Sequence, residues 1–111
     1  YSASIMLRSP RLLGEQYLNL FSDFLPGIRE KVFEGVEDKS IKTEYPEELA
    51  DLIVLTLNIW IGFQISIYPV EELKRKMKFI KLTFEGLGVQ LISDEMMEVI
   101  FNLFGHLKSA K

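Results

Sequence analysis

Apolar residues recur at intervals of three and four along most of the chain, which is the period of an α-helix. The first such stripe follows Ser9 and Pro10, a capping residue and a first-turn proline of the kind that open helices. The pair Pro26-Gly27 falls inside this stripe, and we expect a kink or a break there because proline removes a backbone donor and crowds the preceding turn. The stripe consists of Leu13, Tyr17, Leu20, Phe24 and Ile28, and it continues to Val36.

A second helix is predicted to start at Pro46, after a charged stretch at 37–44 that loses the apolar period and indicates a surface loop. Glu47 and Glu48 fall in its first turn, where the helix dipole favours negative charge. Residues 52–67 are then almost wholly hydrophobic. A membrane span needs about 20 predominantly apolar residues, and this run is interrupted by polar or small residues at nearly every turn. We therefore expect a central helix of a folded domain, packed on several sides.

Two further helices are predicted in the last part of the chain. One follows Pro69, carries an apolar seam with a basic opposite face at 74–81, and ends at Gly86-Leu87-Gly88. The other begins after Ser93 and runs to about Lys108. Since no segment shows sustained alternation, the sequence predicts an all-α fold, an antiparallel helical bundle of about five helices.

Composition narrows the class further. The chain has 111 residues, enough for one domain, and 48% of them are hydrophobic. The absence of cysteine excludes disulfide frameworks, zinc ribbons and thiol catalysis. A net charge of -3 gives no general attraction to DNA or to an anionic membrane. We expect a cytoplasmic protein, and we interpret residues 1–111 as a single regulatory domain of a longer parent because the chain opens at Tyr1 in the middle of apolar sequence.

Candidate chemistry is sparse. His106, the single histidine, has no serine positioned for acyl transfer, and Leu103 stands where a Glu-x-x-His metal motif would need a carboxylate. Glycines at 86 and 88 follow a predicted helix and match no phosphate-binding fingerprint. We therefore expect no catalytic residues, no metal and no cofactor, and a protein that is not an enzyme.

The quantity of apolar surface is the informative feature. The last helix is apolar over a wide arc that leaves only a narrow polar stripe. The helix from Pro46 is also apolar on more than one side, so both helices need a second surface to pack against. A symmetric homodimer with two helices from each chain would satisfy both. The alternative is that an upstream part of the parent covers one of these faces. Mid-helix aromatic residues, with amides at Asn58 and Gln64, fit either a small-molecule pocket or an ordinary core.

The stretch from Tyr45 to Gly62, preceded by Ile28–Asp38, resembles the C-terminal regulatory half of tetracycline-repressor (TetR) family transcription factors. The resemblance covers most of the chain and consists of the order of the helices and the local pattern of residue types. It implies a ligand-binding and dimerisation domain that binds a small, largely apolar inducer, while an N-terminal helix-turn-helix domain, absent here, contacts DNA. By position in the match, the implied ligand-binding residues are Tyr17, Phe21, Phe24, Asn58, Trp60 and Phe63. The implied dimer interface consists of Leu57, Ile61, Ile65, Phe101 and Phe104.

Two functional hypotheses follow. The first is the effector-sensing, dimerising domain of a transcriptional repressor, a homodimer with no membrane contact. The second is a helical protein–protein interaction module that covers its apolar faces with a different protein and binds no small molecule.

Overall fold

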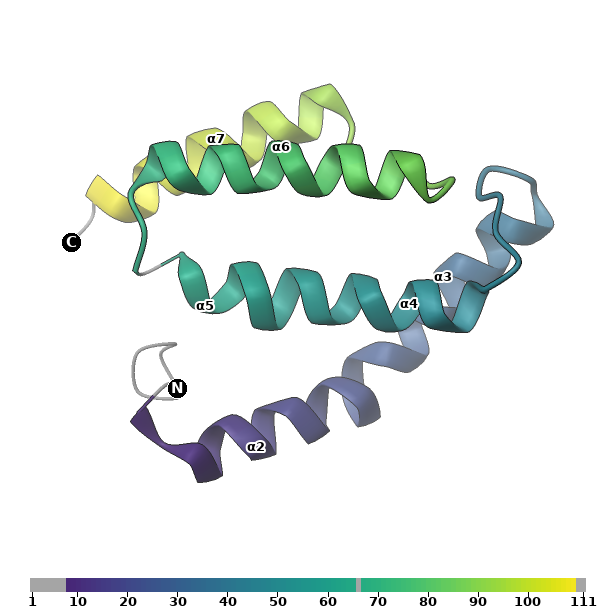
Figure 1. Cartoon of the computed structure of the whole chain (residues 1–111), viewed down its shortest axis with the longest axis horizontal. Helices are drawn as coiled ribbons and strands as arrows, with labels where there is room; N and C mark the ends of the chain where they lie inside the picture. Colours follow the sequence, from purple (N-terminus) through teal and green to yellow (C-terminus); the bar gives the residue numbers. More distant parts are fainter. Residues whose placement is uncertain (1–7, 66, 110–111) are drawn as a thin grey trace.

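The computed structural model describes residues 8–65 and 67–109, with the side chains of Phe104 and of residues 106–109 left out. Over these residues the chain is all-helical and forms four continuous helical rods (Figure 1). The first rod comprises α2 (Pro10–Asn19), η1 (Leu20–Phe24) and α3 (Leu25–Glu37). The second comprises α4 (Pro46–Val54), η2 (Leu55–Ile61) and α5 (Gly62–Gln64), and the last two are α6 (Val70–Gly86) and α7 (Asp94–Ser109).

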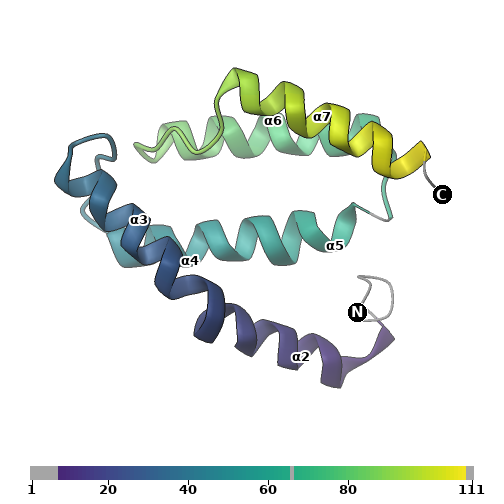
Figure 2. The same ribbon diagram turned by 180° about the vertical axis from the view of Figure 1, so that it is seen from behind.

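The first rod begins as its cap predicts and does not break at Pro26. The Leu12 amide donates to Ser9 Oγ at 3.2 Å, which satisfies one of the free donors of the first turn. Ahead of the proline, η1 is a π-helical turn in which the Leu25 amide donates to the Leu20 carbonyl. This wider turn shifts the backbone before Pro26, so the proline enters at the start of α3 without ending the helix. The axis of α3 turns away from that of α2 in both views (Figures 1 and 2).

The second rod is the central helix, and its middle is π-helical over the seven residues of η2. In a π-helix the amide of residue i+5 donates to the carbonyl of residue i, and the side chain of Asn58 adds a second donor to the Val54 carbonyl at 3.0 Å. The Gly62 amide closes the segment by donating to the Leu57 carbonyl. At Gly62 a Cβ atom would lie 3.2 Å from that carbonyl oxygen, so a residue without a side chain fits the end of the π segment best.

The third and fourth rods form a hairpin. Pro69 precedes α6, which ends at Gly86, and Gly88 follows in the left-handed region at φ 91° as expected of a glycine helix stop. Ser93 Oγ accepts the Met96 amide at 3.1 Å and caps α7. Across the hairpin, Lys81 Nζ lies 2.8 Å from Glu85 and 3.5 Å from Asp94.

The rod formed by α4, η2 and α5 lies beside α6, and together they form one layer (Figure 1). Helices α3 and α7 both pack on one side of this layer, which is the far side in Figure 1 and the near side in Figure 2. The core lies between these elements, and its most completely buried side chains are Phe84, Leu20, Leu73, Ile80 and Val54. The radius of gyration is 15.0 Å, above the ~13 Å of a compact domain of this length. The arrangement is therefore open, and much apolar surface stays uncovered.

The described helices include none whose length and apolar character together would suffice to cross a membrane.

Candidate functional site

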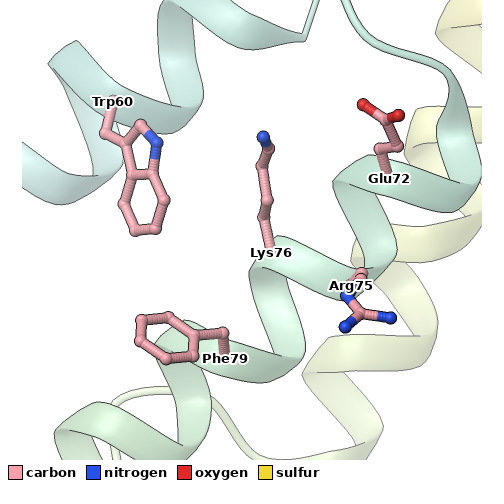
Figure 3. A pocket seen from close by; sticks show the side chains of 5 residues that line it. All are labelled: Trp60, Glu72, Arg75, Lys76 and Phe79. Carbon is pink, nitrogen blue, oxygen red and sulfur yellow. The ribbon is translucent and has the colours of Figure 1, made fainter.

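An aromatic pair marks a hollow between η2 and α6 on the described surface. The rings of Trp60 on η2 and Phe79 on α6 meet edge to face, with centroids 6.5 Å apart. Glu72, Arg75 and Lys76 complete the lining of a hollow of about 410 Å³ (Figure 3). Trp60 is 37% exposed and Phe79 60% exposed. Two large aromatic side chains therefore face outward beside two cations.

The two cations of this hollow form no ion pair with a described carboxylate, although Glu72 shares the lining with them. The Lys76 ammonium lies 4.1 Å from the centroid of the Tyr68 ring, a cation–π contact that fixes its position. Among the described residues no carboxylate lies within 4.0 Å of the charged groups of Lys76 or Arg75. This end of the layer thus offers unneutralised positive charge next to apolar rings.

A smaller hollow of about 180 Å³ lies at the opposite end of α4 and α6. It is apolar at its base and carries the carboxylate of Glu48, in the first turn of α4. The described part of the chain places no basic group within 4.0 Å of that carboxylate. Its lining residues are Thr43, Tyr45, Glu48, Leu49, Leu52 and Leu87.

A separate aromatic cluster lies on the first rod. The rings of Tyr17 and Phe21 have centroids 4.9 Å apart, and Phe24 is exposed one turn further on. No residue of α2 is buried, and Tyr17 remains 47% exposed. Phe21 packs against the core, whereas Tyr17 and Phe24 present aromatic surface without cover from the described chain.

The six expected ligand-binding residues fall into two groups. Tyr17, Phe21 and Phe24 belong to the first rod, and the other three belong to η2 and α5. None of the hollows described above is lined by members of both groups. Within the second group Trp60 faces its hollow, whereas Phe63 is buried and the Asn58 amide is used by the Val54 carbonyl. The nearby Gln64 Oε1 is buried and has no hydrogen-bond partner among the described residues.

The expected interface residues are distributed between core and surface. Ile61 is buried in the core of its own chain, and Ile65 and Phe101 pack against that core. Phe101 also lies beneath Lys74 and Lys78 of α6, with ammonium-to-centroid distances of 5.4 and 5.9 Å, so it serves the α6–α7 contact. Leu57 is partly exposed. The side chains of Phe104 and His106 lie outside the described residues.

Two charged groups have shifted pKa values. The hydrogen bond to Glu85, supported by the charges of Glu85 and Asp94, raises the pKa of Lys81 above 10.5. Hydrogen bonds from the side chain and amide of Ser40 lower the pKa of Asp38 below 3.8. Asp38 stabilises the loop after α3, and Lys81 stabilises the α6–α7 hairpin. Neither group lines one of the two hollows described above. In the described residues no cluster of three metal-ligand side chains occurs.

Sequence reasoning missed the exposed apolar residues of α6. Phe79 and the 67%-exposed Leu82 sit on the basic face of that helix, on the side opposite the buried seam. The signal was present as two large apolar residues interrupting a polar face, a pattern that indicates a binding surface. The arrangement provides aromatic and aliphatic contact area flanked by charge, which suits binding of a partner or a small apolar molecule. Comparison with models of known protein families, with characterised proteins and with solved structures found no match for this chain.

Proposed function

We propose that this chain is the effector-sensing and dimerisation domain of a TetR-like transcriptional repressor. In this proposal the all-helical fold is of the TetR regulatory type, the protein is cytoplasmic, and DNA is contacted by a helix-turn-helix domain elsewhere in the parent protein. A small, largely apolar inducer bound by this domain favours a dimer geometry that no longer fits the operator, which is the differential binding that allostery requires.

The observation that carries the proposal is that the described residues leave two separate apolar surfaces uncovered. One is the aromatic surface of the first rod, and the other is the outward side of the layer formed by α4, η2 and α6. A regulatory domain needs one surface for an effector and another for a second protomer. We assign Tyr17, Phe21 and Phe24 to the effector, and the surface around Trp60 to the contact between protomers.

Native mass spectrometry of the purified chain tests the proposal. We expect a mass of two protomers, with additional mass from a retained small molecule. That additional mass should be lost in Tyr17→Ala and kept in the control Tyr45→Ala, because Tyr45 is also exposed but immediately precedes α4 and lies outside the first rod. A monomer that carries no additional mass would contradict the proposal and favour the interaction module without a small-molecule ligand.

A further inference from the structure

One side of the helical layer is uncovered. In Figure 1 no helix lies in front of α4, η2 and α6, while α3 and α7 lie behind them, and Figure 2 shows the same arrangement from the other side. On α6, the exposed Phe79 and Leu82 point away from the seam that is buried in the core. On the second rod, Leu52 and Trp60 line the hollows shared with α6. We call this surface the open face; its apolar members are Leu52, Trp60, Phe79, Leu82 and Leu87.

The two ends of the open face carry opposite charge. Because α4 and α6 run antiparallel, the start of α4 lies beside the end of α6 (Figure 1). That end has the carboxylate of Glu48, in the small hollow with Leu52 and Leu87. The other end has Arg75 and Lys76, which outnumber the single acid Glu72 in the larger hollow.

This pattern is self-complementary. Rotation by 180° about an axis that lies in the plane of the open face and runs across its helices turns a second copy over and exchanges its acidic and basic ends, so that each end meets its opposite. A two-fold interface requires that kind of reciprocity, in which residue i meets residue j and j meets i. An apolar centre with charged ends also matches the usual division of an interface into core and rim.

We propose that the open face is the contact surface for a second copy of this chain, packed antiparallel so that Glu48 of each protomer lies against Arg75 and Lys76 of the other. The inference rests on the homodimer of the proposed function and specifies its surface and orientation. The dimensions are adequate, since a helix of 17 residues is about 25 Å long and two adjacent helices are about 20 Å wide. A footprint of about 500 Å² on each partner, about 1,000 Å² in total, is near the lower limit of a specific interface.

Charge reversal at the two ends tests the orientation. The variant R75E/K76E has two acidic ends, and the variant E48K has two basic ends. Each should dimerise at least tenfold more weakly than the original chain, because like charges would face each other twice. A 1:1 mixture of the two variants should form a heterodimer, since both of its charge contacts are then between opposite signs. Sedimentation velocity at low salt gives the dissociation constants, and native mass spectrometry identifies the heterodimer by its mass.

Matched controls reverse exposed charges on the helices behind the layer. Lys31→Glu on α3 and Glu98→Lys on α7 should leave the dissociation constant unchanged. Trp60 is the single tryptophan of the chain, so a blue shift of its emission with rising protein concentration would report burial of the open face. Circular dichroism verifies that each variant keeps its helix content, and recovery of the heterodimer verifies it independently.

The outcomes separate this inference from the proposed function. A dimer whose dissociation constant is unaffected by both charge reversals would overturn the open face as the contact surface and leave the homodimer standing. Weakened variants that fail to form a heterodimer would overturn the antiparallel orientation. A chain that stays monomeric at all concentrations would overturn both this inference and the dimeric part of the proposed function.

Discussion

Gly88 lies directly against the backbone of Lys42, and the two residues join the α3–α4 loop to the α6–α7 loop. The Lys42 amide donates to the Gly88 carbonyl at 3.1 Å, and a Cβ atom at Gly88 would collide with the Lys42 carbonyl oxygen. Gly88 also has φ 91°, a conformation that residues with side chains rarely adopt. Two independent reasons therefore require glycine here.

Gly88→Ala should accordingly lower the free energy of unfolding by about 1–3 kcal/mol, through backbone strain and the displaced loop. Urea unfolding followed by circular dichroism gives this value. Gly86→Ala is the matched control, because nothing lies within 4 Å of a Cβ atom there. It should be neutral or stabilising by up to about 1 kcal/mol. Equal destabilisation by both substitutions would contradict the assignment.

Leu73 is fully buried in the seam of α6, at 0% exposure. Leu73→Ala should lower the free energy of unfolding by about 2–5 kcal/mol, since it removes buried methyl groups and leaves a cavity. The same substitution at Leu18, which is 67% exposed on α2, should cost less than about 0.5 kcal/mol. Both values come from urea titrations at one protein concentration. A similar loss at the two positions would show that the seam of α6 is not the core.

In the π segment η2 the side chain of Asn58 donates a hydrogen bond to the backbone carbonyl of Val54. Asn58→Leu keeps the approximate size but removes the bond to the Val54 carbonyl. We expect a loss of about 0.5–1.5 kcal/mol in the free energy of unfolding, because the net contribution of one part-buried hydrogen bond is removed. The exposed Asn102 on α7 provides the control, and Asn102→Leu should have no comparable effect. An Asn58→Leu protein as stable as the original would contradict this role.

The contact of Lys81 with Glu85 and Asp94 should make the hairpin weaker at high pH. Its pKa is raised in the folded chain, so its stabilising contribution is complete below the ordinary value of 10.5 and is lost as the pH rises through the higher folded value. The melting temperature should therefore fall between about pH 10 and pH 12 more steeply in the original chain than in Lys81→Gln. The effect is small because the partners are exposed and screened by solvent. Parallel curves for the two proteins would contradict it.

The beginnings of the helices could be predicted from the sequence because capping is local. Pro10, Pro46 and Asp94 begin helices as expected, and Pro69 immediately precedes α6. The sequence predicts about five helices, and the described residues form four helical rods because the first rod continues past Pro26. That outcome goes with the π turn η1 ahead of Pro26, which begins at Leu20, a side chain buried in the core.

The candidate site was less predictable because it depends on which side of each helix is covered. Periodicity identified Ile61 and Phe101 as apolar, yet both serve the chain's own core. The exposed residues Phe79 and Leu82 lie outside the apolar seam of α6. The three-and-four spacing that identifies the seam therefore does not identify them. The core can be distinguished from the open face only when it is known that α3 and α7 pack on the same side of the layer (Figure 2). This arrangement belongs to the tertiary structure and cannot be derived from the periodicity of one helix.

The π segment also sets the direction of Trp60. In a regular α-helix a residue eight positions after Leu52 would be rotated about 80° away from it, nearly a quarter turn. The wider turns of η2 advance by a smaller angle per residue and bring the indole back into line with Leu52. η2 thus works as an angular spacer, and deleting one of its residues ahead of Trp60 would rotate the indole away from the ring of Phe79, which it meets edge to face.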